Sequence, residues 1–402
     1  MAAHGKSSSS LNKLACLITI LCVGICGGVQ VPKTIIESAV SKGAVCLDGS
    51  PPAYHLKAGS GEGAKSWLVY LQGAGWCLNS SGIYHTKDDN STVQSCAERS
   101  RGALGSSHAM NPWDFNQLFD DRPNVSYFYN WNRVVVRYCD GGSFAGDADK
   151  PDPVTNLYYR GARIFRAVVK ELMRAEGMRK GSNILLAGGS AGGLGVIIHC
   201  DRFVRLFSKH NVRVKCLADS SLFLRVQDPL RAKFFNTVFS TVVALHHPHK
   251  ALPSKCTKSS NNSTVDCFFP KTLLNYIKSP IFILNPAFDS FQIKCTFGED
   301  LYEQVKNHTV SKTDMVLLQD FRHHIIGALP PAAASDTKNG YLITSIYGHS
   351  LGTSSPQSCK GPMFADRNSE PFGSAILDWF FDRTPHVPHL LIDPADQPFY
   401  QA

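Results

Sequence analysis

A predicted strand, a tight turn and a predicted helix follow one another between Asn183 and Phe207, and this arrangement constrains the fold more than any other segment. The turn Gly188-Gly-Ser-Ala-Gly192 matches G-x-S-x-G, and its small end residues let the backbone bend sharply. A serine in such a turn projects its hydroxyl into the cleft above a parallel sheet, so Ser190 is the predicted nucleophile. A Gly-rich structural turn or a phosphate-binding loop is the alternative, but the chain contains neither G-x-x-x-x-G-K-[ST] nor G-x-G-x-x-G here.

Short apolar segments alternate along the chain with segments of helical spacing. The predicted helices are Tyr159–Arg174, Leu194–Phe207 and Ala375–Phe381, and polar insertions occupy 78–130 and 246–268. The predicted strands are 66–71, 133–138, 183–187, 212–217, 281–285 and 341–346. This alternation predicts an α/β-hydrolase-like fold, with a mostly parallel central sheet, helices on both faces and loop-rich insertions.

A nucleophilic serine needs a base to take its proton and an acid to orient that base. In an α/β-hydrolase the chain order is Ser, then Asp or Glu, then His. Asp289 and His349 each follow a predicted strand by a few residues, which places both at the carboxyl edge of the sheet, where the cleft lies. We therefore predict Ser190, Asp289 and His349 as the catalytic residues.

Other aspartates and histidines remain alternatives for these two roles. The rival acids are Asp219, Asp314 and Asp320. His199 lies nine residues along the helix after Ser190, which places it far from the hydroxyl. The remaining rivals are His323 and His324 in a predicted helix, and His246, His247 and His249 in a polar insertion that we expect to face solvent.

The loop Gly73-Ala-Gly-Trp76 ends the predicted strand at 66–71. Small residues there can aim backbone N–H groups at the negative oxygen that forms when a serine attacks an ester. The N–H of Ala191 begins the helix after the nucleophile, where the positive end of the helix dipole favours the same oxygen. We predict Ala74, Gly75 and Ala191 as oxyanion donors, although a simple turn would also use these residues.

The N-terminal segment has the pattern of a secretory leader. Lys6 and Lys13 precede an apolar run from Leu14 to Val23, and small residues follow near Gly28. We predict a signal peptide at 1–28 and a single esterase domain at 29–402. An uncleaved anchor is the alternative, but its roughly 16 apolar residues are short for a bilayer span of about 20, so we expect no membrane span after cleavage.

Cysteines and glycosylation sequons also indicate export. Of 13 cysteines, ten follow the predicted leader, and none forms a C-x-x-C pair. Such a dispersed, even number is typical of disulfides in an oxidising compartment, and it argues against a cysteine-based zinc site; we expect no metal and no cofactor. Six N-x-S/T sequons predict glycosylated surface positions at Asn79, Asn90, Asn124, Asn261, Asn262 and Asn307.

The net charge of the chain is +9 at pH 7, and +7 once the two leader lysines are removed. This charge favours an acidic partner such as a polyanionic polysaccharide, although ordinary surface charge would also explain it. No run of five basic residues occurs, so a nucleic-acid partner is not expected. We expect a monomer.

Several long motifs of this chain resemble those of the plant pectin acetylesterases, a family related to the animal Notum carboxylesterases. The resemblance covers roughly residues 46–383. The stretches that carry it are Leu47–His55, Tyr70–Cys77, Asn130–Arg133, Arg137–Gly141 with Ser143-Phe144, Gly189–Gly193, and Asp378-Trp379 with Asp382-Arg383.

The resemblance implies a secreted α/β-hydrolase that removes acetyl groups from pectin in the plant cell wall (the apoplast) without a metal. It also implies that Ser190 is the nucleophile, that the Asn285–Asp289 stretch supplies the acid and that the Ser345–His349 stretch supplies the base. The family's oxyanion loop G-G-G-W is similar to Gly73–Trp76.

Three departures from the family pattern surround the predicted site. The family commonly has Cys directly before the nucleophile and on both sides of the His, where this chain has Gly189, Ile346 and Ser350, and the Cys-rich tail is absent. Two alternatives to a pectin acetylesterase stay open: a Notum-like esterase for a longer acyl chain, and a wall polysaccharide-binding relative without catalysis.

Overall fold

The computed structural model describes residues 28–78, 94–225, 233–259, 261–331, 333, 338–353, 372–384 and 389–398. Residues 1–27 of the predicted signal peptide, the sequons at Asn79 and Asn90, and Cys359 lie outside the described residues. The division into a signal peptide and one domain therefore stays a prediction.

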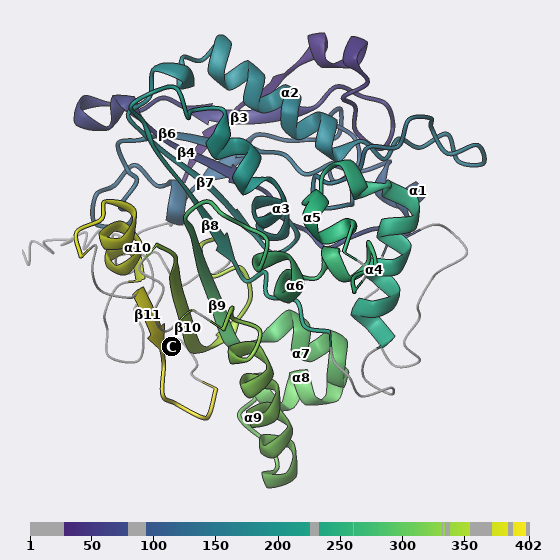
Figure 1. The fold of residues 1–402 in the computed structure, drawn as a ribbon, viewed down its shortest axis with the longest axis vertical. Helices are drawn as coiled ribbons and strands as arrows, with labels where there is room; N and C mark the ends of the chain where they lie inside the picture. Colours follow the sequence, from purple (N-terminus) through teal and green to yellow (C-terminus); the bar gives the residue numbers. More distant parts are fainter. Residues whose placement is uncertain are drawn as a thin grey trace, which may run out of the picture.

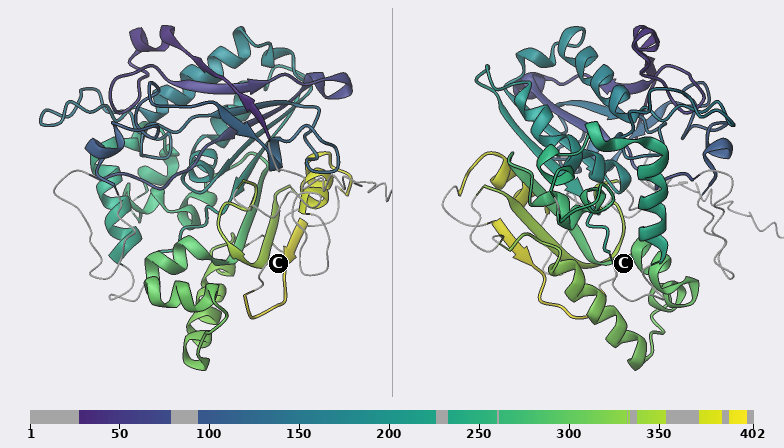
Figure 2. Two further views of the ribbon diagram at one scale, coloured as in Figure 1. Left: turned by 180° about the vertical axis from the view of Figure 1, so that it is seen from behind. Right: turned by 45° about the vertical axis from the view of Figure 1, so that its right-hand side comes forward.

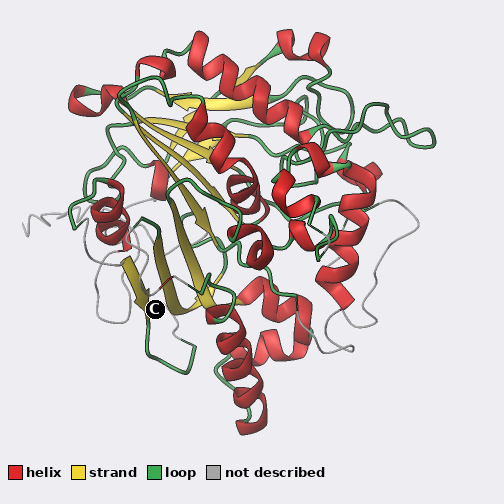
Figure 3. Ribbon diagram, in the orientation of Figure 1, coloured by secondary structure: helices red, strands yellow, loops and turns green. Residues whose placement is uncertain are grey.

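A nine-stranded sheet forms the centre of the molecule, in the order β11-β10-β9-β8-β7-β4-β6-β3-β2 (Figures 1 and 3). The strands from β11 to β6 are parallel to one another. At the edge beyond β6, β3 pairs antiparallel with β6, and β2 pairs antiparallel with β3. The bounds of these strands are β2 Lys33–Ile35, β3 Ala53–Lys57, β4 Ser66–Leu71, β6 Asn132–Val136, β7 Asn183–Gly189, β8 Arg213–Asp219, β9 Ile281–Asp289, β10 Gly340–Gly348 and β11 His389–Ile392. The predicted, mostly parallel central sheet is confirmed.

Helices cover both faces of this sheet. Figure 2 shows the yellow α10 on one side of the sheet and the teal helices on the other. The helices are α1 Cys96–Arg99, α2 Gly161–Arg174, α3 Ala191–Arg205, α4 Lys233–His246, α5 Ser254–Thr257, α6 Pro270–Leu274, α7 Ser290–Phe297, α8 Glu299–Lys306, α9 Lys312–Ile326 and α10 Phe372–Phe380. A separate two-stranded sheet pairs β1 Val29–Val31 with β5 Trp113–Phe115.

Two hydrophobic cores lie on the two faces, because successive side chains of a strand point to opposite sides. In β4, Trp67, Val69 and Leu71 join the larger core with α2, α3 and α9, whereas Leu68 and Tyr70 join the core beneath α10. Strands buried on both faces carry near-continuous apolar runs, which is why these segments were recognisable in the sequence.

The order of the strands determines where the cleft lies. From the central β4 the chain passes to β6 on one side and then to β7 on the other. Ligands of open α/β sheets bind beyond the carboxyl ends of the strands at such a reversal. The segments that leave these ends are the loop after β4, which begins at Gln72, and the turn between β7 and α3.

The predicted elements differ from the observed ones mainly at their ends and in the insertions. Helix α2 begins at Gly161 instead of Tyr159, and β8 continues to Asp219 instead of ending at Leu217. The helix α4, which follows β8, was not predicted; its mean hydropathy is high and its sequence is rich in β-branched and aromatic residues. Such residues have no strong intrinsic helix preference, so tertiary packing decides their conformation.

Four disulfides join eight of the ten cysteines that follow the predicted leader: Cys46–Cys139, Cys77–Cys96, Cys200–Cys216 and Cys256–Cys267. They tie the chain on the larger-core side and around the loop after β4, and each closes a loop whose freedom in the unfolded chain it restricts. The disulfide prediction is confirmed for these eight cysteines.

The four sequons within the described residues differ in accessibility. Asn124, Asn261 and Asn307 are exposed, whereas Asn262 is half-buried and its amide donates a hydrogen bond of 2.9 Å to the Tyr276 hydroxyl. Of the overlapping pair, Asn261 is thus the more accessible position for a glycan. None of the described helices is long and apolar enough to cross a membrane.

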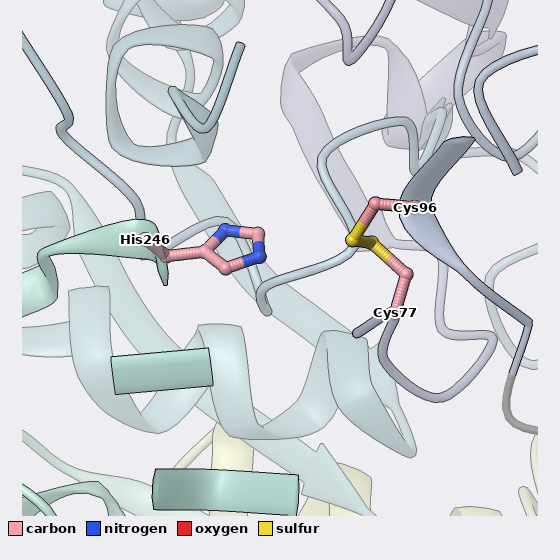
Figure 4. Close-up of side chains that lie close together, drawn as sticks. All are labelled: Cys77, Cys96 and His246. Atoms are coloured by element: carbon pink, nitrogen blue, oxygen red, sulfur yellow. A yellow bond between two sulfur atoms is a disulfide. The ribbon is translucent and has the colours of Figure 1, made fainter. Parts of the chain in front are cut away.

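The expectation that His246 faces solvent is wrong. It is the last residue of α4, fully buried, and its ring lies 4.6 Å from that of Tyr159. Its neighbours Cys77 and Cys96 are joined in a disulfide (Figure 4). Because metal binding by cysteine requires free thiolates, this group of three does not form a metal site in the oxidised protein.

Among the described residues, three histidines are buried, and burial favours their neutral form. Burial lowers the pKa of His55 to about 4, and those of His199 and His246 to about 3. An unfolded histidine protonates near pH 6.5, so below that pH the unfolded state binds more protons than the folded state. As the pH is lowered from 6.5 towards 4, these three histidines should therefore contribute a decrease in the free energy of unfolding.

We predict that His246→Gln makes this acid-dependent loss shallower, by at most about 1.4 kcal/mol per pH unit, since one titrating group is removed. Urea denaturation between pH 7 and 4.5 measures the slope. The exposed neighbour His247→Gln is the matched control and should leave the slope as in the wild type. An unchanged slope in His246→Gln would show that this ring does not contribute.

Candidate active site

The three predicted catalytic side chains lie in one hydrogen-bonded chain. His349 Nε2 is 2.8 Å from Ser190 Oγ, and His349 Nδ1 is 2.8 and 3.0 Å from the two carboxylate oxygens of Asp289. With Nδ1 protonated and donating to Asp289, Nε2 can accept the serine proton. Ser190 and Asp289 are buried, and the side chain of His349 is 17% exposed.

The sharp turn at Ser190 holds its backbone in an unusual conformation. Ser190 has φ 55° and ψ −128°, a region that a residue with a side chain adopts only when its surroundings impose it. A Cβ on Gly188 would lie 2.7 Å from the carbonyl oxygen of Gly192, and one on Gly192 would collide with the carbonyl oxygen of Leu71. The two outer glycines of the G-x-S-x-G pattern are thus required because the ends of the turn contact each other and β4, which leaves no room for a side chain.

Asp289 occupies the last position of β9 and caps the next helix. Its carboxylate accepts a hydrogen bond of 2.9 Å from the backbone N–H of Gln292, at the start of α7. An aspartate at this cap position stabilises the helix and is itself held in one orientation. The carboxylate therefore meets His349 in a fixed geometry.

The loop after β4 lies directly against the nucleophile turn. A Cβ on Gly73 would lie 2.9 Å from Ser190 Cβ and 3.2 Å from the Ala191 nitrogen. Gly75 has φ +59°, which favours glycine. Within the described residues, no hydrogen bond is made by the backbone N–H groups of Ala74, Gly75 or Ala191, so all three remain available as donors.

Buried polar side chains fix this loop by hydrogen bonds. Arg99 donates a hydrogen bond of 2.9 Å to the carbonyl oxygen of Ala74, and the Tyr138 hydroxyl donates one of 2.8 Å to that of Gly75. The indole N–H of Trp76 donates to Ser143 Oγ at 2.9 Å. With their carbonyl groups fixed, the loop's peptide planes cannot turn freely, and sequence reasoning missed these supports because they come from distant segments.

The end of β8 connects the nucleophile to the loop that carries the histidine. The Asp219 carbonyl oxygen accepts from the Ser190 N–H at 2.9 Å, and its carboxylate accepts from the N–H groups of Leu351 and Gly352 at 3.1 and 2.8 Å. Ser220 Oγ accepts from the N–H of Ser350 at 2.8 Å. Asp219, considered as a rival acid, thus contacts the histidine loop instead of the imidazole nitrogen.

Two of the departures from the family pattern lie side by side. A Cβ on Gly189 would lie 3.6 Å from Ser350 Cβ, which is within the range of a disulfide, but it would collide with the Tyr70 hydroxyl. In this chain Tyr70 fills the space, and its hydroxyl lies 3.2 Å from Thr353 Oγ1. Hydrogen bonds, not a covalent link, therefore join the nucleophile turn to the histidine loop here.

The other rival residues lie away from the serine. His199 is buried in α3, where its Nε2 lies 2.7 Å from the carbonyl oxygen of Phe144 and its ring stacks on Phe165. Asp314 and Asp320 lie in α9, as do His323 and His324, and His247 and His249 are exposed.

Two carboxylates favour the protonated form of His349. Burial opposes its protonation, but Asp289 and, more weakly, Asp219 outweigh this effect and raise the pKa of His349 above its ordinary value of 6.5. Burial also raises the pKa of Asp219 to about 6, against the effect of its hydrogen bonds. An imidazolium formed during reaction is thus stabilised from two sides.

This arrangement contains what acyl transfer requires: a nucleophilic oxygen, a base within hydrogen-bond distance, an acid that orients the base, and N–H groups beside the nucleophile. Its chemistry is the attack of a serine on a carbonyl carbon. None of the residues gathered here needs a metal for that step.

Comparisons with known proteins agree with this chemistry. A family model described as pectinacetylesterase matches residues 27–400. Pectin acetylesterases 11 and 7 of Arabidopsis thaliana are 37% and 36% identical to this chain over 379 residues, covering 91% of this chain and 92% of each relative. The human palmitoleoyl-protein carboxylesterase NOTUM is 27% identical over 62% of this chain and 49% of its own length.

Among solved structures, the Wnt deacylase Notum from Drosophila superposes with a TM-score of 0.74, covering 92% of this chain and 98% of that one. At 22% sequence identity this similarity shows the fold alone. The predicted α/β-hydrolase-like fold is confirmed.

We predict that Ser190→Ala lowers the rate of ester hydrolysis by about three or more orders of magnitude and leaves the fold intact. His349→Ala should cost nearly as much, because the two side chains act as one unit. Hydrolysis of p-nitrophenyl acetate measures the rate, with His247→Ala as the control. Near wild-type turnover in either variant would remove that residue from the mechanism.

We also predict that activity is lost in acid as His349 protonates, with a midpoint above pH 6.5, since only the neutral imidazole accepts the serine proton. Asp219→Asn removes one of the charges that raise the pKa of His349, so the midpoint should move to lower pH. The asparagine keeps one acceptor but not two, so the maximal rate should also fall, by about tenfold.

The pH dependence of kcat/KM tests this effect, with the exposed Asp320→Asn as the matched control. A lower rate without any change of the midpoint would assign Asp219 a purely structural role.

Proposed function

The chain belongs to the pectinacetylesterase family, and on this premise we propose that it hydrolyses acetyl esters of pectin and releases acetate, with Ser190, His349 and Asp289 as its catalytic residues. It is a carboxylic ester hydrolase. The observation that carries the proposed site is the hydrogen-bonded chain from Ser190 through His349 to Asp289. Beside it lies a glycine-containing loop in which the N–H groups of Ala74 and Gly75 make no hydrogen bond to any described residue.

In the first half of the reaction, Ser190 Oγ attacks the acetyl carbonyl carbon while His349 Nε2 takes the hydroxyl proton. The carbonyl oxygen becomes negative, and the N–H groups of Ala74, Gly75 and Ala191 stabilise it. Asp289 stabilises the imidazolium through the hydrogen bond at Nδ1. Collapse of the tetrahedral intermediate expels the sugar hydroxyl, which receives its proton from His349.

In the second half, water attacks the acetyl group on Ser190. His349 takes a proton from that water and then returns it to Ser190 Oγ as acetate leaves. The same groups therefore serve both halves, and the resting hydrogen bonds are restored at the end.

Aromatic rings packed beside the histidine favour a short acyl group. The rings of Phe291 and Phe223 lie 5.1 and 6.4 Å from that of His349, and Trp76 packs on Phe223 with ring centroids 4.8 Å apart. Trp76 and Phe223 are almost fully buried, and the ring of Phe239 packs against both. These closely packed rings place bulky side chains beside His349, and this supports acetyl transfer over the Notum-like alternative.

Disulfides, sequons and the N-terminal leader support secretion to the plant cell wall, where acetylated pectin is the substrate. We propose that the secreted chain acts there as a monomer. The positive net charge agrees with an acidic polymer substrate.

Acetate release from acetylated pectin, compared with acetylated xylan, tests the proposed substrate. The purified protein should release acetate from pectin at a higher kcat/KM, and Ser190→Ala should release none above background. A preference for xylan would reject the pectin assignment. Failure of an active-site phosphonate to label the protein would instead favour a non-catalytic polysaccharide-binding relative.

A series of p-nitrophenyl esters from acetate to octanoate tests the acyl group. We predict a steep fall of kcat/KM beyond butyrate in the wild type. Phe223→Ala should leave a cavity beside His349 and raise the ratio of hexanoate to acetate hydrolysis by about tenfold. The control is Phe321→Ala, a buried phenylalanine of α9. Preference of the wild type for long chains would support the Notum-like alternative.

A further inference from the structure

A hollow on the outer surface of α2 and α3 is separate from the catalytic residues. It has a volume of about 470 Å³, with apolar side chains that include Phe165, Val169 and Met173. Its lining also includes the cations Arg166, Lys170, Arg174, Arg179 and Arg202. A second hollow of about 320 Å³ adjoins it between η1 (Glu37–Lys42) and α2, and shares Arg166, Lys170 and Arg174 with it. We call the two hollows together the cationic groove.

The cations on α2 form a row. Arg166, Lys170 and Arg174 are spaced four residues apart and are exposed, so they share one face of the helix. With a rise of 1.5 Å per residue, neighbouring members lie about 6 Å apart along the helix axis. Like charges at this spacing destabilise an isolated helix, so the row is not explained by helix stability.

Acidic side chains balance only part of this charge. Arg166 contacts Asp147 at 3.4 Å, and Glu171 lies in the lining of the groove. Within the described residues, Lys170, Arg174, Arg179 and Arg202 form no ion pair. Arg174 and Lys42 lower the pKa of Lys170, as expected where cations face one another without a counterion.

The groove extends away from the catalytic serine along α3. Helix α3 begins directly after Ser190, and His199, Arg202 and Leu206 of this segment line the groove. His199 is nine residues beyond Ser190, which corresponds to about 13 Å of helix. A ligand that occupies both places must span at least this distance, as a chain of several linked units does.

We propose that the cationic groove binds the carboxylates of a polyuronate chain and so holds the backbone of pectin while another part of the same polymer reaches Ser190. A row of cations at regular spacing matches a chain that carries repeated carboxylates better than it matches one anionic group. The apolar side chains between the cations can pack against the C–H faces of the sugar rings. This inference rests on the proposed function for the identity of the polymer, whereas anion binding by the groove does not depend on catalysis.

Binding of unacetylated polygalacturonate, which is not a substrate, tests the groove directly. Affinity electrophoresis and isothermal titration calorimetry at low and high NaCl should show binding by the wild type that weakens as salt screens the charges. Lys170→Glu/Arg174→Glu should raise the Kd at least tenfold. The carboxylate introduced at position 170 can pair with Arg166 four residues away, so α2 is expected to stay folded.

The matched control is Lys271→Glu/Lys312→Glu, which changes the net charge equally at exposed positions of α6 and α9. It should bind polygalacturonate as the wild type does. In the same variants, hydrolysis of p-nitrophenyl acetate should be unchanged, whereas the KM for acetylated pectin should rise only for the groove variant.

The outcomes separate the two proposals. No binding of polygalacturonate by the wild type, or equal loss in both double variants, would overturn the groove. Binding to vesicles of anionic phospholipid without binding to polygalacturonate would also overturn it. If the groove variant alone loses polygalacturonate binding while no variant deacetylates pectin, the groove stands and the proposed function fails.

Discussion

The carboxyl ends of β4 and β7 approach so closely that their backbones touch, and the rest of the site depends on this contact. Gly73 faces the nucleophile turn at a distance that leaves no room for a side chain, and Gly192 packs against the carbonyl oxygen of Leu71. Adjacent parallel strands impose this spacing, and the reversal of strand order opens the cleft above it. The oxyanion loop and the serine therefore meet without any side chain having to reach across a gap.

Buried carboxylates organise the second half of the site. Asp289 contacts the imidazole directly, whereas Asp219 holds the nucleophile's N–H and the loop that carries His349. Both charges favour a protonated imidazole, against the effect of burial. Asp289, at the end of β9, orients the base. Asp219, at the end of β8, positions Ser190 and the loop of His349 relative to each other, so the site depends on the ends of both strands.

In the proposed function, the aromatic rings and the surface cations contact different parts of one substrate. Trp76 packs on Phe223, which lies beside His349, where we propose that the acyl group binds. The cations of α2 line the groove on the outer helical layer, and a chain of several linked units could contact both regions. Separate surfaces for catalysis and for binding the chain suit a substrate in which a small acyl group is attached to a large anionic polymer.

The sequence by itself determined the local patterns: buried strands show as apolar runs, the strand–turn–helix around Ser190 shows as G-x-S-x-G, and the chain order of Ser190, Asp289 and His349 follows from strand ends. It predicted where these three residues lie because parallel strands end at one edge. The supports contributed by Asp219, Arg99 and Tyr138 were not predictable, since hydrogen bonds between segments far apart in the chain leave no periodic signal. Tertiary packing likewise decided that His246, at the end of α4, is buried and that cations of α2 and α3 line one groove. Packing alone determines which side chains from distant segments lie together and which face water.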